Sequence, residues 1–254
     1  MSLNDKIKNI SFKEVMILII FSFIVFFVLN FAGIKIGSYW IYFAVIVYFV
    51  FKLRDCKQEF RQDLTNIFDK VSFKLILLIV VANIFFSYGM LYLSKYLITI
   101  PQVNQFISFN MISKTSFVVV GGYVAKLVIS PISEELIFRG VIFNKLKTIV
   151  PITFAVLVSS LVFGSFHNYG SMVSAVVFAL CMCILYIKTE NIIVPIFAHF
   201  LNNLFAEIIF TADYNGLLFT NGNLMILVSF LAFISLVYLS SFIVNELNSI
   251  KYLR

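Results

Sequence analysis

The chain alternates long apolar runs with short polar connections, and this pattern predicts a helical membrane protein. A helix needs about 20 predominantly apolar residues to span a bilayer. Apolar runs of about this length lie at residues 15–34, 39–53, 73–97, 117–143, 149–168, 171–188, 191–210 and 222–244. The second run is short. The sequence therefore predicts an all-α fold, a polytopic membrane protein with about eight transmembrane helices.

The positions of Lys and Arg predict how these helices are oriented, because basic residues gather on the cytoplasmic side of a membrane. With the N-terminus cytoplasmic, most basic residues fall on that side: Lys6, Lys8, Lys13, Lys52, Arg54, Lys57, Arg61, Lys70, Lys74, Lys145, Lys147, Lys188, Lys251 and Arg254. The outer side holds only Lys35, Lys95 and Lys114. Both termini are therefore predicted to be cytoplasmic. No small-residue cleavage site follows the first apolar run, so we expect it to be retained as a span.

The longest predicted cytoplasmic connection, residues 55–72, mixes charges with apolar residues at roughly helical spacing. The apolar positions are Phe60, Leu64, Ile67, Phe68 and Val71. This pattern predicts an amphipathic helix on the membrane surface. A solvated charged loop is the alternative.

Composition strengthens the prediction of a membrane protein and excludes a soluble globular protein. The chain is 61% hydrophobic and 12% charged, with a mean hydropathy of +1.02, which leaves too little polar surface for a soluble globule of 254 residues. No repeat or linker marks a second domain, so residues 1–254 are predicted to form one integral-membrane domain in contact with the lipid bilayer. The net charge of +7 reflects topology, and no nucleic-acid partner is expected. The richness in Lys, Asn, Ile and Phe suggests a bacterial cytoplasmic membrane. Cys56, Cys181 and Cys183 form neither a CxxC pair nor a disulfide framework.

The stretch Pro131–Gly140 places three charged residues within six positions of a predicted span. Ionised side chains in a bilayer cost several kcal/mol each unless they are paired or hydrated, so this cluster is a functional-site candidate. Glu135 and Arg139 are four residues apart and can form a buried ion pair on one helical face. Glu134 lies about 100° around the helix and lacks that partner, which suits it to act as a general base. The alternative is a three-member ion cluster that only holds helices together.

The two histidines of the chain lie in two other predicted spans, each with a partner four residues away. Phe163 and His167 share one helical face, as do His199 and Asn203. If the hairpin of the fourth and fifth helices turns near residue 150, Glu134 and His167 lie about 24 and 25 Å from the turn and can face each other. A single membrane histidine more often serves packing, but two beside a carboxylate cluster favour chemistry.

A second ion pair is predicted toward the outer side of the same helices. Lys126 lies eight residues before Glu134, and Glu207 lies eight residues after His199. Both displacements are about 12 Å, so the two side chains could meet between helices. The alternative is that each reaches the outer interface separately.

Together, these motifs resemble those of the CPBP family of intramembrane proteases, which includes the type II CAAX prenyl endopeptidases and the bacterial Abi proteins. Glu134, Glu135 and Arg139 match the pattern EExxxR. Phe163 with His167 matches FxxxH, and His199 with Asn203 matches HxxxN. The resemblance covers residues 117–210, which would form the catalytic core. The first three helices and the last one remain unassigned.

The resemblance implies hydrolysis of a peptide bond in a membrane-associated peptide or protein. Glu134 with His167 would hold and deprotonate the attacking water, and His199 with Asn203 would donate hydrogen bonds to the oxyanion. Glu135 and Arg139 would orient the site, with Phe163 as a structural residue beside them.

A cofactor is a separate question, because two histidines and a glutamate are also a ligand set of catalytic zinc sites. No HExxH pattern is present. Similarity to relatives of the family favours catalysis without a cofactor. The alternative is zinc bound by Glu134, His167 and His199.

Two other functions compete with proteolysis. One is a non-proteolytic scaffold or bacteriocin-immunity protein of the same family, acting on a membrane regulatory partner, with the polar cluster as structural glue. Intramembrane hydrogen bonds are often worth only about 0.6 kcal/mol, so seven motif residues are more than packing needs. The other is a transporter. An inverted repeat or a pair of broken helices would support that function, and the sequence contains neither.

Overall fold

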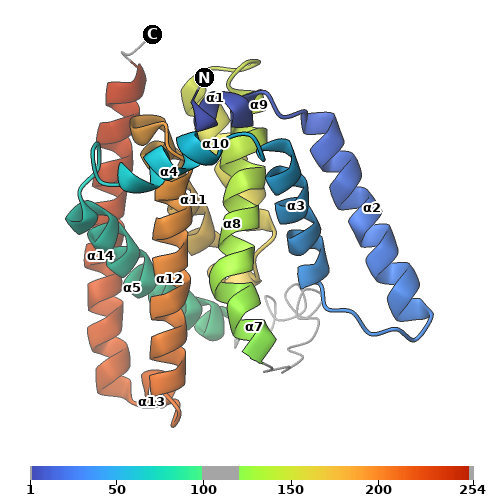
Figure 1. Cartoon of the computed structure of the whole chain (residues 1–254). Coiled ribbons are helices and arrows are strands. Elements are labelled where there is room, and N and C mark those ends of the chain that lie inside the picture. The colour runs from blue at the N-terminus through green and yellow to red at the C-terminus, as the bar shows by residue number, and fades with distance from the viewer. Residues whose placement is uncertain (1, 99–119, 252–254) are drawn as a thin grey trace.

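The computed structural model describes residues 2–98 and 120–251, and the regular structure in these ranges is entirely helical (Figure 1). Lys114 and the start of the predicted 117–143 run lie outside the described residues. Five helices within the described ranges are long and apolar enough to cross a membrane. They are α2 (Phe12–Phe31), α5 (Phe73–Ile98), α11 (Tyr169–Thr189), α12 (Ile193–Ala212) and α14 (Gly222–Lys251).

The other three predicted spans are helical but shorter or interrupted. Two are the short apolar helices α3 (Tyr39–Lys52) and α10 (Ile152–Ser165). The third is a continuous run that changes between α and π geometry: α7 (Val120–Val124), η2 (Ala125–Ile129), α8 (Ser130–Glu135), η3 (Leu136–Phe143) and α9 (Asn144–Leu146). Pro131 lies in this run and has no amide hydrogen for the helix, which is one established cause of such irregularity.

Short helices cover one end of the bundle. The apolar pattern did not predict α1 (Leu3–Lys8), a six-residue helix that begins with a capping box between Ser2 and Asp5 and buries Ile7. The predicted amphipathic connection 55–72 contains α4 (Lys57–Thr65), which is shorter than predicted. Lys6 Nζ of α1 lies 3.4 Å from Glu59 Oε1 of α4. At the opposite end, α13 (Leu217–Thr220) leads into α14.

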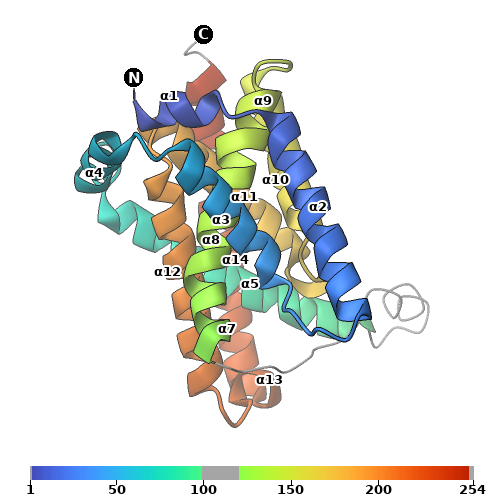
Figure 2. The ribbon, with the colours of Figure 1, turned by 45° about the vertical axis from the view of Figure 1, so that its right-hand side comes forward.

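The core forms around α5 and α11. Helix α5 crosses the bundle obliquely and packs against α14, α11 and α12 (Figures 1 and 2). Residues 181–186 of α11 are all buried, so this part of the helix is enclosed on every side. By contrast, α2 packs mainly on α3 at the edge and exposes large apolar side chains such as Phe21 and Phe27. An apolar outer surface of this kind matches a lipid environment.

Helices α5 and α14 touch at a position that has no room for a side chain. A Cβ built on Gly89 would lie 2.5 Å from the Cβ of Ala232. Ala232 Cβ is fixed to its own helix and cannot move alone, so the two helices would have to separate. Small residues at such a contact let two membrane helices approach closely.

Gly89→Leu is therefore expected to lower the free energy of unfolding by about 3 kcal/mol, because the new side chain overpacks the contact. Gly222→Leu is the matched control, since no atom lies within 4 Å of a Cβ built there. Thermal unfolding of both variants in detergent micelles measures the difference. Equal melting temperatures would show that the contact between α5 and α14 is not close packed.

Candidate active site

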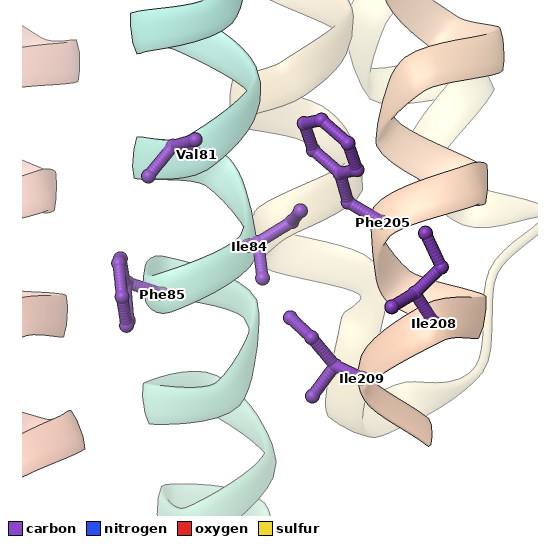
Figure 3. A pocket seen from close by; sticks show the side chains of 6 residues that line it. All are labelled: Val81, Ile84, Phe85, Phe205, Ile208 and Ile209. Carbon is purple, nitrogen blue, oxygen red and sulfur yellow. The ribbon is translucent and has the colours of Figure 1, made fainter. Parts of the chain in front are cut away.

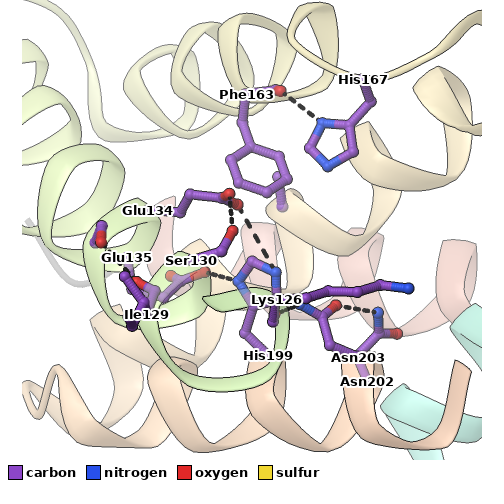
Figure 4. A network of polar contacts seen from close by, with 12 residues as sticks. Lys126, Ile129, Ser130, Glu134, Glu135, Phe163, His167, His199, Asn202 and Asn203 are labelled. Atoms are coloured by element: carbon purple, nitrogen blue, oxygen red, sulfur yellow. Dashed lines mark hydrogen bonds and ion pairs between the residues drawn. The ribbon is translucent and has the colours of Figure 1, made fainter. Parts of the chain in front are cut away.

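Glu134 and Glu135 of the central helical run lie inside the bundle, facing α12 and α10 (Figure 4). Glu135 is fully buried, and Arg139 is only 1% exposed. Arg139 Nη1 donates to Glu135 Oε1 at 2.9 Å, and Nη2 donates to the carbonyl oxygen of Ala179 on α11 at 3.0 Å. The ion pair predicted from the four-residue spacing is thus present.

Glu135 also holds His199, a contact that the sequence did not predict. His199 Nδ1 lies 2.8 Å from Glu135 Oε1. If the carboxylate is ionised it can only accept, so Nδ1 must carry the hydrogen. His199 Nε2 is then turned toward Glu134, 3.8 Å from Oε2. One buried carboxylate therefore orients both the arginine and the imidazole.

Glu134 has a different environment from its neighbour. Its side chain is 13% exposed, and Ser130 Oγ, one turn earlier on the same helix, donates to Oε1. The side chain of Tyr42 on α3 also interacts with Glu134 and Ser130. Spacing alone could have identified Ser130. Tyr42 lies in another predicted helix, and no motif marked it.

His167 lies just beyond the end of α10, and a backbone carbonyl fixes its ring. Its Nδ1 is 3.1 Å from the carbonyl oxygen of Phe163. A carbonyl can only accept, so Nδ1 carries the hydrogen and Nε2 is an acceptor in the neutral ring. Carbonyls in the last turn of a helix lack their regular partners, which explains why this one is available. Glu134 interacts electrostatically with His167, and the described contacts include no direct hydrogen bond between them.

Phe163 connects the three motifs through its ring, which is buried. The guanidinium carbon of Arg139 lies 4.9 Å from the ring centroid. The ring centroids of His167 and His199 lie 4.8 and 6.0 Å from that of Phe163. The phenyl group thus forms an apolar wall that limits how either imidazole can turn.

Asn203 lies one turn after His199. A backbone carbonyl of another helix and a neighbouring side chain both bind its carboxamide. Its Nδ2 donates to the carbonyl oxygen of Lys126 at 3.0 Å, and its Oδ1 accepts from Asn202 Nδ2 at 3.5 Å. Asn202 Oδ1 in turn accepts from Asn83 Nδ2 of α5 at 2.9 Å. The HxxxN spacing marked Asn203, and no motif marked Asn202 or Asn83.

The predicted outer ion pair is present as well. Lys126 Nζ contacts Glu207 Oε2 between η2 and α12. Glu207 is largely buried, whereas the Lys126 side chain is half exposed. Residue 126 therefore binds α12 at two points, through its carbonyl at Asn203 and through its ammonium group at Glu207.

The proposed zinc ligands do not converge in this arrangement. Among residues 2–98 and 120–251, no group of three His, Cys, Asp or Glu side chains is placed to hold a metal ion. Glu135 engages His199 Nδ1 and a carbonyl engages His167 Nδ1, so Nε2 is the ring nitrogen of each that remains available. The cofactor prediction, with zinc bound by Glu134, His167 and His199 as its alternative, stays a prediction.

A cavity of about 180 Å³ lies elsewhere, between α5 and α12 (Figure 3). Its lining is entirely apolar: Val81, Ile84, Phe85, Phe205, Ile208 and Ile209. No residue of the three motifs contributes to it. This cavity can take a hydrocarbon chain but offers no group for chemistry.

Comparison with known proteins finds a family model that matches the segment containing the site. Residues 115–205 match the family described as type II CAAX prenyl endopeptidase Rce1-like. The matched segment contains all seven residues of the EExxxR, FxxxH and HxxxN motifs. The resemblance to the CPBP family is confirmed.

One curated relative also matches, the Bacillus subtilis (strain 168) protein named "Putative membrane peptidase YdiL". It is 38% identical over 82 residues, which cover 32% of this chain and 34% of the relative. The alignment thus spans about a third of either protein. No solved structure matches. With five helices long enough to span a bilayer and a membrane-peptidase relative, the chain is an integral membrane protein, and a bacterial origin is consistent with that relative.

Proposed function

We propose that this chain is an intramembrane endopeptidase that hydrolyses a peptide bond in a membrane-associated peptide or protein. The observation that carries the proposal is that His167 and His199 interact with the partly accessible carboxylate of Glu134 inside an apolar bundle, with Asn203 one turn after His199. Because water is scarce there, polar side chains in such number need a chemical reason. The matches to peptidase sequences support the same conclusion.

All eight predicted helices cross the bilayer in this proposal, with both termini cytoplasmic. The N-terminal helix α1 and the last turns of α14 lie at the same end of the bundle (Figures 1 and 2). Basic residues of that end form exposed ion pairs, such as Lys8 with Glu190 and Lys188 with Glu246. The lysines at that end support a cytoplasmic position for it, because the positive-inside rule counts basic residues whether or not they are paired.

Water activation is assigned to Glu134 and His167. A water molecule that donates one hydrogen to Glu134 and the other to His167 Nε2 would be held by both. The water oxygen attacks the carbonyl carbon of the scissile peptide bond while its proton passes to Glu134. Glu134 then gives that proton to the leaving nitrogen as the C–N bond breaks, so one water is consumed for each bond cleaved.

We assign stabilisation of the oxyanion in the tetrahedral intermediate to His199 and Asn203. Because Nδ1–H of His199 is used by Glu135, the ring can donate from Nε2 only when both nitrogens carry hydrogens. Such a cation has one carboxylate on each side, Glu135 at Nδ1 and Glu134 near Nε2. Asn203 has two hydrogens on Nδ2, of which one is bound to Lys126 O and the other is available.

The two histidines therefore differ in chemistry because their Nδ1 partners differ. A backbone carbonyl holds His167 with Nε2 as an acceptor, which suits it to bind water. A carboxylate holds His199, which suits it to carry positive charge and donate to an oxyanion. The contacts support this division of labour, which agrees with the roles that the family resemblance implies.

The experiment that tests the proposal is peptide profiling of cells that carry either the wild-type protein or Glu134→Gln at equal abundance. Peptides ending at one type of cleaved bond are expected only with the wild type, together with accumulation of their precursor. Identical profiles, with the cellular phenotype preserved in Glu134→Gln, would instead support the non-proteolytic scaffold. The profiles would also identify the substrate for work with purified protein.

A further inference from the structure

The orientation of the Asn203 carboxamide decides whether it can serve an oxyanion. Its nitrogen donates hydrogen bonds, whereas its oxygen would repel developing negative charge. The two ends have almost the same shape, so packing cannot distinguish them. Only the hydrogen-bond partners of the amide can do so.

Two partners distinguish the ends of Asn203 (Figure 4). The carbonyl oxygen of Lys126 accepts from Nδ2 at 3.0 Å, and Asn202 Nδ2 donates to Oδ1 at 3.5 Å. If the amide were reversed, Oδ1 would face the Lys126 carbonyl, and two acceptors would meet. The Lys126 carbonyl is the closer partner and therefore the main determinant.

A carbonyl oxygen in the middle of a helix normally accepts a hydrogen bond from an N–H of the same helix. Pro131 explains why the Lys126 carbonyl is available to another partner. In α geometry its donor would be the N–H of Ser130, but this group donates to Ala125 O at the end of the π segment η2. In π geometry its donor would be the N–H of residue 131, and proline has none. The π segment and the proline together leave this carbonyl open to Asn203.

We propose that Pro131 is a positioning residue for catalysis: it keeps the Lys126 carbonyl free of helical hydrogen bonds, and this carbonyl orients Asn203 with Nδ2 toward the reacting atoms. The inference rests on the proposed function and extends it to a residue outside the three motifs. It also gives the π segment a role, since π segments frequently occur at functional sites.

Pro131→Ala tests the inference because alanine supplies the missing N–H. We expect kcat to fall roughly tenfold with KM nearly unchanged, since the substrate still binds while Asn203 is oriented correctly for only part of the time. Asn203→Ala should lower kcat by about 10²- to 10³-fold, the usual cost of one lost oxyanion donor. Adding Pro131→Ala to Asn203→Ala should cause no further loss. Additive losses, or wild-type kcat in Pro131→Ala, would overturn the inference.

Two variants separate this role from general helix stability. Pro195→Ala removes another buried helical proline, in the first turn of α12 where a helix needs no N–H, and should keep wild-type kcat. Lys126→Met removes the ammonium group but keeps the carbonyl, so its kcat should stay above that of Pro131→Ala. A lower kcat for Lys126→Met would assign the effect to the Glu207 ion pair and overturn the inference.

A readout that does not need activity distinguishes failure of this inference from failure of the proposed function. In protein labelled with ¹⁵N-asparagine, the Asn203 side-chain NMR signal is assigned by its loss in Asn203→Ala. Pro131→Ala should shift this signal, while Pro195→Ala should not. An unshifted signal in Pro131→Ala overturns the positioning role, even if the protein proves not to be a peptidase.

Discussion

Glu134→Gln is expected to lower the rate of peptide-bond cleavage by about 10²- to 10⁴-fold, the usual contribution of a general base. Glutamine has nearly the same shape, and its amide oxygen can still accept from Ser130. It cannot take a proton from water at neutral pH. The loss should therefore appear in the chemical step, and single-turnover cleavage of a substrate peptide by purified protein measures it.

A surface glutamate supplies the matched control for Glu134→Gln. Glu59 lies at the surface, where it pairs with Lys6 at 3.4 Å, and Glu59→Gln should leave the cleavage rate unchanged. Glu59→Gln should melt within a few degrees of the wild type, because surface ion pairs contribute little. If Glu134→Gln cleaves as fast as Glu59→Gln, the role assigned to Glu134 is wrong.

Arg139→Met is expected to destabilise the protein by about 3–5 kcal/mol, because it leaves the fully buried carboxylate of Glu135 without its cation. The guanidinium also packs on Phe163 and binds Ala179 O, and these contacts are lost with it. Lys188→Met breaks a more exposed pair with Glu246 and should cost only about 0–1 kcal/mol. Denaturant unfolding in mixed micelles compares the two variants.

The double variant Glu135→Leu with Arg139→Met separates the effect of this ion pair on protein stability from its effect on the orientation of His199. Replacing both charges with apolar side chains should recover much of the lost stability, since buried pairs are often replaceable in this way. Activity should remain low, because His199 Nδ1 loses its carboxylate. A stable double variant with wild-type kcat would show that Glu135 does not orient His199.

Much of the helical architecture followed from apolar periodicity and length. The predicted span at 191–210 corresponds to Ile193–Ala212, and that at 73–97 to Phe73–Ile98. Helix α1 was missed because six residues with two lysines carry too little apolar signal, although Ile7 is completely buried. The π segments were also missed, since apolar periodicity locates a helix but does not reveal its hydrogen-bond register.

Within the site, contacts along one helix could be predicted, and contacts between helices mostly could not. The four-residue spacing located the pair of Glu135 and Arg139, and matched depth located Lys126 with Glu207. The bond from His199 to Glu135 depends on helix rotation, which spacing does not determine. The same limit applies to Asn203, whose partner is a backbone carbonyl that no side-chain motif marks.

The most direct test of the central claim is cleavage of one membrane-associated peptide by purified protein in lipid vesicles, followed by mass spectrometry. The wild type is expected to form two fragments whose masses sum to the peptide plus one water, and Glu134→Gln is expected to form neither over the same period. Intact peptide with the folded wild type, or equal fragment formation by both proteins, would contradict it.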